Sequence, residues 1–192
     1  MIDQAAAVAH PHVDPDVCLV RAMADGDTHA LDQLYARHGP SLLVFLTAQL
    51  GDRQVAEEVL QDVMLAVWQG AASFRGDSRV HTWLLVIARH RAVNLLRRKV
   101  LPRVPLNDMI ADRSQAAYEQ IEHDDDTNDV RRMLQQLPDD QRQTLELIFY
   151  HELSGQEAAA VLGVATGTIK SRLNRAKSTL RKMWNSKEDH DS

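Results

Sequence analysis

The sequence has a single cysteine, Cys18, among its 192 residues. This excludes a disulfide within the chain and any zinc site built from a pair of its own cysteines. Aromatic residues make up only 5% of the chain and apolar residues rarely alternate with polar ones, so strands have little support. No apolar run approaches the roughly 20 residues of a membrane-spanning helix, and no secretory signal pattern opens the sequence. We therefore expect no membrane insertion and a cytoplasmic location.

Patterns typical of catalysis are also missing. The histidines are scattered, no nucleophile has a base at a recognisable spacing, and the glycine-rich loop of phosphate-binding enzymes is absent. We expect no enzymatic activity, no metal and no cofactor. His10, His12 and Cys18 leave two alternatives open, a metal or redox sensor or incidental residues in a tail.

Charge is distributed unevenly along the chain, although the formal net charge is only -5. Residues 84–100 have five basic and no acidic side chains, and residues 163–184 have six basic and no acidic ones. Residues 101–129 have two basic side chains against eight acidic ones. Because local potential governs steering to DNA more than the overall charge does, the sequence predicts two basic surfaces joined by an acidic connector.

Apolar residues mostly recur at spacings of three and four, which predicts an all-α fold. We expect two small helical domains, residues 15–100 and 128–185, joined by a flexible acidic linker, with tails on either side. The tails are residues 1–14, which we expect to be disordered, and 186–192, and the linker is residues 101–127. The expected helices cover 16–25, 28–50 with a possible bend at Gly39-Pro40, 53–69, 82–99 after a polar loop at 72–81, 128–137, 138–151, and a final pair.

The final pair of helices has the pattern of a helix-turn-helix. Ser154 and Glu157 form a capping box, Gly163 can end that helix, and Thr166 can cap the next one. The second helix should bury the stripe Ile169, Leu173, Ala176 and Leu180. Wheel geometry turns the following side chains away from that stripe, towards solvent or a DNA groove: Lys170, Ser171, Asn174, Arg175, Ser178, Arg181 and Lys182. A solvated basic face on an ordinary helical hairpin is the alternative.

Two further segments carry candidate binding residues. The helix at 53–69 has Leu65 and Trp68 among acidic and polar residues, opposite its apolar side, which indicates a protein interface with an aromatic anchor. The alternative is that Trp68 folds back on a neighbouring helix.

The segment 73–89 interleaves flat side chains with cations, as unpaired bases require, although Phe74 and Trp83 would serve equally well as core residues. Its flat groups and cations are Phe74, His81 and Trp83 with Arg75, Arg79 and Arg89.

Taken in order, these segments resemble the extracytoplasmic-function sigma factors, a compact two-domain branch of the sigma-70 superfamily. The resemblance covers residues 16–184. It is carried by AEEVLQDVMLAVW (56–68), FRGDS (74–78) with TWL (82–84), IARHRAVNLLRR (87–98), and VATGTIKSR (164–172) preceded by LPDDQR (137–142). The sequence departs from the family after Ser78, where Arg79-Val80-His81 replaces a further aromatic residue.

The resemblance implies a transcription initiation factor with a region 2-like and a region 4-like domain. Core RNA polymerase, through its beta-prime and beta subunits, would bind Glu58, Gln61, Asp62, Leu65 and Trp68. The minus-ten promoter element would contact Phe74, Arg75, Asp77, Ser78, Arg79, Trp83, Arg89, Asn94, Arg97 and Arg98. The minus-thirty-five element would contact Thr166, Thr168, Lys170, Ser171, Arg172, Asn174, Arg175 and Lys177.

The resemblance further implies that the acidic linker follows the RNA exit path of the polymerase and that an anti-sigma factor, expected to be membrane-associated, holds the protein inactive. Two other functions stay open. A stand-alone helix-turn-helix regulator would need an effector or dimerisation domain, and a sigma mimic would sequester an anti-sigma factor without binding DNA. The two acid-free basic segments argue against the mimic.

Overall fold

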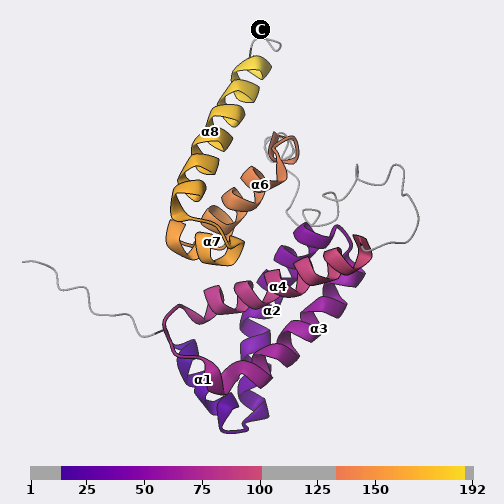
Figure 1. The fold of residues 1–192 in the computed structure, drawn as a ribbon, viewed down its shortest axis with the longest axis vertical. Coiled ribbons are helices and arrows are strands. Elements are labelled where there is room, and N and C mark those ends of the chain that lie inside the picture. Colours follow the sequence, from indigo (N-terminus) through magenta and orange to yellow (C-terminus); the bar gives the residue numbers. More distant parts are fainter. Residues whose placement is uncertain (1–13, 101–132, 189–192) are drawn as a thin grey trace, which may run out of the picture.

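The computed structural model describes residues 14–100 and 133–188, and every regular element in these ranges is helical (Figure 1). The expected all-α fold is confirmed. The predicted tails and the acidic linker lie largely or wholly outside the described residues. An N-terminal helix group contains α1 (Asp16–Ala24), α2 (Thr28–Leu50), α3 (Arg53–Gly70), the short η1 (Ala71–Ser73) and α4 (Val80–Val100). A C-terminal helix group contains α6 (Asp139–Leu145), the one-turn π-helix η2 (Glu146–Tyr150), α7 (Gly155–Leu162) and α8 (Thr166–Glu188).

Local capping explains where several helices begin and end. The Asp52 carboxylate accepts hydrogen bonds from the backbone at the start of α3, and Gly51 has a left-handed φ of 71° that ends α2. Ser154 and Glu157 make both hydrogen bonds of the predicted capping box, and Gly163 ends α7 with a φ of 66°. Both ends of α7 inferred from the sequence are therefore confirmed, whereas Thr166, predicted to cap the next helix, is the first residue of α8 itself.

Helix α4 begins at Val80, two residues earlier than predicted, and the polar loop before it is correspondingly shorter. The cause is a distant carboxylate: the Val80 backbone N–H donates to Oδ2 of Asp14 at 2.7 Å. This bond gives the N–H at the helix start, which has no acceptor within its own helix, a charged acceptor. Sequence spacing could not reveal it, because the two residues are far apart in the chain.

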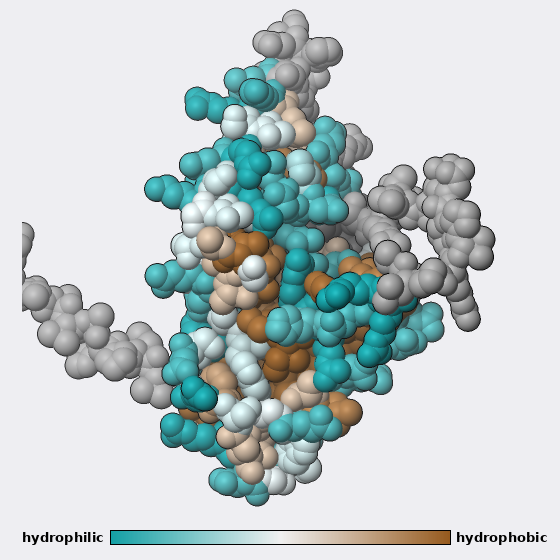
Figure 2. Space-filling model, in the orientation of Figure 1, coloured by the Kyte–Doolittle hydropathy of each residue, from teal (hydrophilic) through white to brown (hydrophobic). Residues whose placement is uncertain are grey.

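The two helix groups share one hydrophobic core. Phe45, Leu84 and Leu85 of the N-terminal group and Leu147 and Leu153 of the C-terminal group are buried in the same cluster. Figure 1 shows α7 next to α4 at this junction, and Figure 2 shows hydrophobic patches over the middle of a mostly hydrophilic face. The sequence predicts two domains and contains no signal of this contact between them.

The C-terminal group also has a smaller core between α6 and α8. Leu137, Leu145 and Ala176 are buried there, with Leu173 and Leu180 packed against them. Ile169 is buried too, in the larger core. The predicted apolar stripe of α8 is thus confirmed. Within the described ranges, no helix is long and apolar enough to cross a membrane.

Candidate nucleic-acid and polymerase interfaces

The predicted DNA-facing side of α8 is open to solvent. Lys170, Ser171, Asn174, Arg175 and Lys177 are all exposed. The Arg175 guanidinium lies back along its own helix, with Nη2 3.3 Å from the Ser171 hydroxyl. At the start of the helix, Thr166 is exposed and Thr168 half-buried. This surface offers several donors and cations in a helix of the right width for a major groove.

Arg172 is the exception among the predicted minus-thirty-five residues. Its side chain is only 20% exposed, and its Nε lies 3.1 Å from Oδ2 of Asp140 in α6. The ion pair joins the two helices that enclose the small core. In this structure Arg172 therefore holds α8 against α6 and does not lie on the open face.

The α3 surface predicted to bind a protein is exposed except at its aromatic residue. Leu65 is 55% exposed, and Glu58, Gln61 and Asp62 are exposed beside it. Trp68 is half-buried and packs against the main core. The ring therefore contributes to packing, as the alternative supposed, and Leu65 is the exposed apolar residue of this surface.

The segment before α4 places its two large aromatic rings together. The Phe74 and Trp83 ring centroids are 4.8 Å apart with an interplanar angle of 41°, and both residues pack against the core. A tilted pair at this centroid separation lies within the range of favourable aromatic contacts. Arg75, Asp77 and Ser78 are exposed on the loop between them. In this structure the rings are packed and the polar residues of the loop are accessible.

Arg79 is clamped to the C-terminal group. Its Nε donates to Oε1 of Glu157 at 2.6 Å, and its Nη2 donates to Oε2 of Glu157 at 2.9 Å and to the Glu152 carbonyl at 3.0 Å. Thr82 donates to the same Glu157 carboxylate at 2.8 Å. Glu152 has a φ of 54°, a left-handed conformation uncommon outside glycine.

Glu157 therefore has two roles, of which only the capping box was predicted. Burial alone would raise the pKa of its carboxyl, but hydrogen bonds from Arg79, Ser154 and Thr82 outweigh burial and lower the pKa to about 2. The carboxylate stays charged throughout the neutral and mildly acidic range. We refer to the contact of Arg79 and Thr82 with Glu157 as the Glu157 clamp.

Arg89, a predicted minus-ten residue, is also engaged between the groups. Its Nη1 donates to Oε1 of Gln49 at 2.6 Å and to Oε1 of Gln143 at 3.0 Å. Burial, followed by the charge of Arg172, lowers the pKa of its guanidinium. Asn94, Arg97 and Arg98 are exposed further along α4. The predicted minus-ten residues thus divide into accessible ones, the two aromatic residues packed against the core, and the arginines bound to the C-terminal group.

Three histidines that are far apart in the sequence meet at the same junction. The ring of His81 lies 5.3 Å from that of His38 and 5.5 Å from that of His151, measured between centroids. His151 also contacts the ring of Phe45 edge-on, and its Nδ1 is 3.1 Å from the Ser41 hydroxyl. In the sequence the three histidines are scattered and His81 is predicted only as a stacking platform, because no sequence spacing links them.

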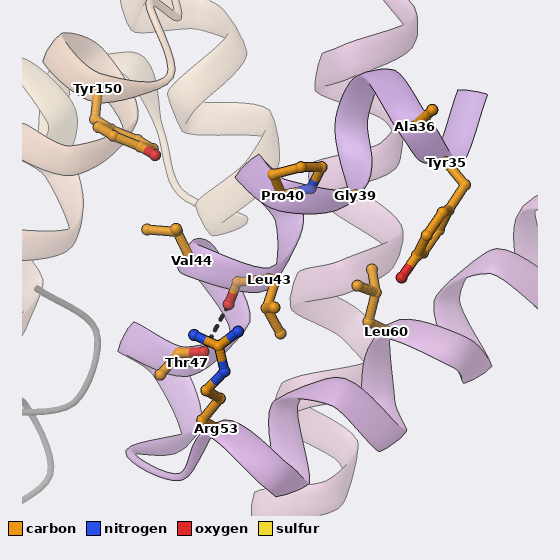
Figure 3. Close-up of a pocket in the computed structure, with 10 residues that line it drawn as sticks. All are labelled: Tyr35, Ala36, Gly39, Pro40, Leu43, Val44, Thr47, Arg53, Leu60 and Tyr150. Atoms are coloured by element: carbon orange, nitrogen blue, oxygen red, sulfur yellow. Dashed lines mark hydrogen bonds between the residues drawn. The ribbon is translucent and has the colours of Figure 1, made fainter. Parts of the chain in front are cut away.

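A groove of about 440 Å³ runs beside the junction (Figure 3). Most of its lining comes from α2, including Tyr35, Gly39 and Pro40, while Leu60 comes from α3 and Tyr150 from the C-terminal group. Figure 3 shows Tyr150 facing Pro40 and Val44 across the gap. Pro40 does not end the helix, since α2 continues through it to Leu50.

Residues 34–100 match the family model for Sigma-70 region 2, and residues 127–180 match that for Sigma-70, region 4. The chain is 37% identical to the ECF RNA polymerase sigma factor SigM of Mycobacterium tuberculosis, over 90% of this chain and 86% of that protein. It belongs to the ECF branch of the sigma-70 family. It is also 34% identical to the ECF RNA polymerase sigma factor RpoE of Cereibacter sphaeroides, over 86% of this chain and 92% of that protein.

Two solved structures of sigma factors resemble this sigma factor in fold. CnrH in complex with the cytosolic domain of CnrY has a TM-score of 0.62 and 26% identity, covering 89% of this chain and 97% of that one. The sigma factor RpoE in complex with the anti-sigma factor NepR from Bartonella quintana has a TM-score of 0.58 and 26% identity, covering 80% of this chain and 96% of that one. The resemblance inferred from the sequence is confirmed.

Proposed function

We propose that this sigma factor binds core RNA polymerase through the exposed face of α3 and directs it to promoters. The residues assigned to the polymerase contact, with its beta-prime and beta subunits, are Glu58, Gln61, Asp62, Leu65 and Trp68. Leu65 supports the assignment most directly, because it is a large apolar side chain, 55% exposed, on the face of α3 that the family resemblance assigns to the polymerase. We propose no enzymatic activity for the chain, and we place it in the cytoplasm with the polymerase.

The single observation that carries DNA binding is the open cationic face of α8. Lys170 lies near the start of the second helix of the motif, where such helices enter the major groove, and Arg175 is also exposed further along the same helix. We assign this face to the minus-thirty-five element. We assign the minus-ten element to the exposed residues of the loop and of α4, such as Arg75, Asn94 and Arg97.

We propose that an anti-sigma factor holds the protein inactive until a stress signal releases it. Two solved relatives of this chain are bound to such partners, the cytosolic domain of CnrY and NepR. The groove between Tyr35 and Tyr150 supports the proposal, since a segment lying in it would contact both helix groups at once. A membrane-associated inhibitor would fit the cytosolic-domain partner of the first relative.

Promoter-specific runoff transcription tests the function. Purified chain added to core RNA polymerase should produce transcripts from a promoter with matched minus-ten and minus-thirty-five elements, and core polymerase alone should not. Tight, promoter-specific binding without polymerase would favour a stand-alone regulator. Binding of polymerase or of an anti-sigma factor without any transcription would favour a sigma mimic.

A further inference from the structure

The histidine cluster lies across the junction between the two helix groups. His81 is in the first turn of α4 and His38 is in α2, both in the N-terminal group, while His151 follows η2 in the C-terminal group. Among the contacts between the three histidine rings, only the one between His81 and His151 crosses the junction, with ring centroids 5.5 Å apart, and His151 also contacts Ser41 and Phe45 of α2. Separation of the groups would therefore expose these two rings to water while leaving His38 beside its own helix partners.

Hydrogen bonding differs among the three rings. His38 Nε2 lies 2.6 Å from Oδ2 of the buried Asp16, and His151 Nδ1 lies 3.1 Å from the Ser41 hydroxyl. Among the described residues, His81 Nδ1 and His151 Nε2 are buried without a hydrogen-bond partner. A proton added at either nitrogen would create a buried N–H donor with no acceptor and a charge beside another imidazole, both of which are costly.

Charged groups of both signs surround the cluster. The acidic ones are Asp14 and Asp16 at the start of α1 and Glu152 and Glu157 from the C-terminal group, and the basic ones are Arg37 in α2 and Arg79 before α4. Asp16 pairs with Arg37 and His38, and Glu157 pairs with Arg79. Asp16 and Glu157 are thus each engaged with an arginine, and neither carboxylate is paired with His81 or His151.

The balance of these effects disfavours protonation. Burial, then the charges of His38 and Arg79, lowers the pKa of His81 to about 4 against the opposing charges of Glu157 and Asp14. Burial, then His81, lowers the pKa of His151 to about 4. Burial, then Arg37, lowers the pKa of His38 against Asp14.

We propose that His81 and His151 form a proton-sensitive latch that keeps the two helix groups together while both rings are neutral and releases them when the rings are protonated. The latch goes beyond the proposed function, because it concerns the two helix groups of the free chain. For a sigma factor, the consequence is that acidification would release Arg79 and Arg89 from the C-terminal group, which binds both side chains in the closed form.

The sign of the effect follows from the two pKa values of each ring. In the separated form an exposed histidine has an ordinary pKa of about 6.5, and in the closed form the value is lower. The latch therefore acts fully above pH 6.5 and weakens as the pH falls towards 4. Between pH 7.5 and 6 the open-to-closed ratio should rise about 4-fold for each histidine and about 15-fold for both. The Glu157 clamp does not titrate in this window.

Intramolecular energy transfer can measure the ratio in the full chain. Two dyes would be attached at Ala24→Cys in α1 and Ser178→Cys in α8, both exposed positions, in a Cys18→Ser background. The titration from pH 7.5 to 5.5 would be run with a chelator present and repeated with Glu157→Gln, which loosens the clamp and increases the open fraction. We expect transfer to fall with acidification in at least the loosened chain.

Substitution of the histidines decides the mechanism. Between pH 7.5 and 6, the open-to-closed ratio should rise about 4-fold in His81→Gln and about 4-fold in His151→Gln. In the double variant the ratio should rise less than 2-fold, whatever its closed fraction at neutral pH. His29→Gln, at an exposed histidine of α2, is the matched control and should respond like the parent chain. Two results would overturn the latch. One is energy transfer independent of pH in the Glu157→Gln chain that keeps both histidines. The other is single histidine variants whose open-to-closed ratio responds to pH as strongly as that of the chain with both histidines. Loss of transcription alone would bear on the proposed function and not on the latch.

Discussion

Two cationic surfaces of this chain differ in what their cations contact. On α8, Lys170 and Arg175 are both exposed in the part of the chain that the structure describes. Arg79, just before α4, and Arg89, in the middle of α4, are bound to the C-terminal group through Glu157 and Gln143. The comparison teaches that a basic segment identified in the sequence is not equivalent to an available binding surface, since a neighbouring domain can satisfy its cations first.

The physical difference lies in the partners that the chain itself supplies. A bidentate arginine–carboxylate pair is among the stronger polar contacts in proteins, and Glu157 provides one to Arg79. Because Arg79 is about half exposed, solvent screening limits the contribution of the pair to about 1 kcal/mol. Polymerase or DNA could therefore displace the Glu157 clamp at modest cost.

The largest expected effect concerns the α3 surface, which like α8 is open in the free chain. Leu65→Ala should weaken binding to core polymerase by about 2 kcal/mol, roughly 30-fold, since anchors at protein interfaces commonly lose this much on truncation. Fluorescence anisotropy with labelled sigma factor would measure the affinity. Phe149→Ala, at an apolar residue 65% exposed in the C-terminal group, is the matched control.

Trp68→Ala separates anchoring from packing on the same surface. Because the ring packs against the core, this variant should lose stability as well as affinity, whereas Leu65→Ala should keep the parent melting temperature. An unfolded Leu65→Ala chain, or one with full affinity for polymerase, would contradict the assignment of this surface.

The next effect concerns the open face of α8. Arg175→Ala should reduce transcription from promoters with a minus-thirty-five element by about 10-fold, within the roughly 1–3 kcal/mol of a bidentate base contact, and relax preference at one base position. If Lys170 contacts phosphate, Lys170→Ala should weaken binding to all promoter sequences alike and reduce, by about one unit, the slope of log affinity against log salt concentration. Binding to core polymerase should be unchanged in both variants.

Arg172→Ala sharpens the contrast within the same helix. Arg172 pairs with Asp140, so its loss should lower the melting temperature without changing base preference. Promoter substitution series, compared among the three variants across a range of salt concentrations, would measure both properties. If Arg172→Ala changed base preference while Arg175→Ala did not, the assignment of the open face would be wrong.

A smaller effect is expected from releasing Arg79 from Glu157 of the C-terminal group. Glu157→Gln keeps a side chain that the capping box tolerates but removes the charge that holds Arg79. The free chain should then bind a single-stranded minus-ten oligonucleotide about 5-fold more tightly, as expected for loss of a contact of about 1 kcal/mol. Glu152→Gln, which changes a neighbouring carboxylate but not the carbonyl that Arg79 uses, is the control. Equal affinity in the parent and Glu157→Gln chains would show that the clamp does not compete with DNA.

The smallest effect concerns a carboxyl that no DNA surface uses. Burial raises the pKa of Glu146 in η2 to about 8, against the opposing charge of Arg142. The folded-state pKa of this carboxyl lies above its unfolded-state pKa. The carboxyl therefore costs the fold little free energy below pH 4.5, and the stability of the C-terminal group falls as the pH rises through 8. Glu146→Gln should raise the melting temperature at pH 9 by about 3 °C and have less effect at pH 6. Scanning calorimetry at both pH values, with Glu58→Gln as an exposed control, would check this.

The sequence alone was sufficient to predict features that depend on neighbours a few residues away. The capping box at Ser154, the helix end at Gly163 and the buried stripe on α8 follow from helical spacing and local hydrogen bonding, and they are found where they were expected. The two-domain sigma factor organisation could also be inferred, because its motifs occur in order along the chain.

Only the tertiary structure decided which of these residues are available to a partner. Arg79, Arg89 and Arg172 are as basic in the sequence as Lys170 and Arg175, but folding brings Glu157, Gln143 and Asp140 within hydrogen-bonding or ion-pairing distance of the first three. The histidine cluster arises in the same way, from three residues on separate elements. The physical reason is that burial, charge pairing and pKa depend on distances in space, which residues far apart in the chain acquire only when the two helix groups close on a common core.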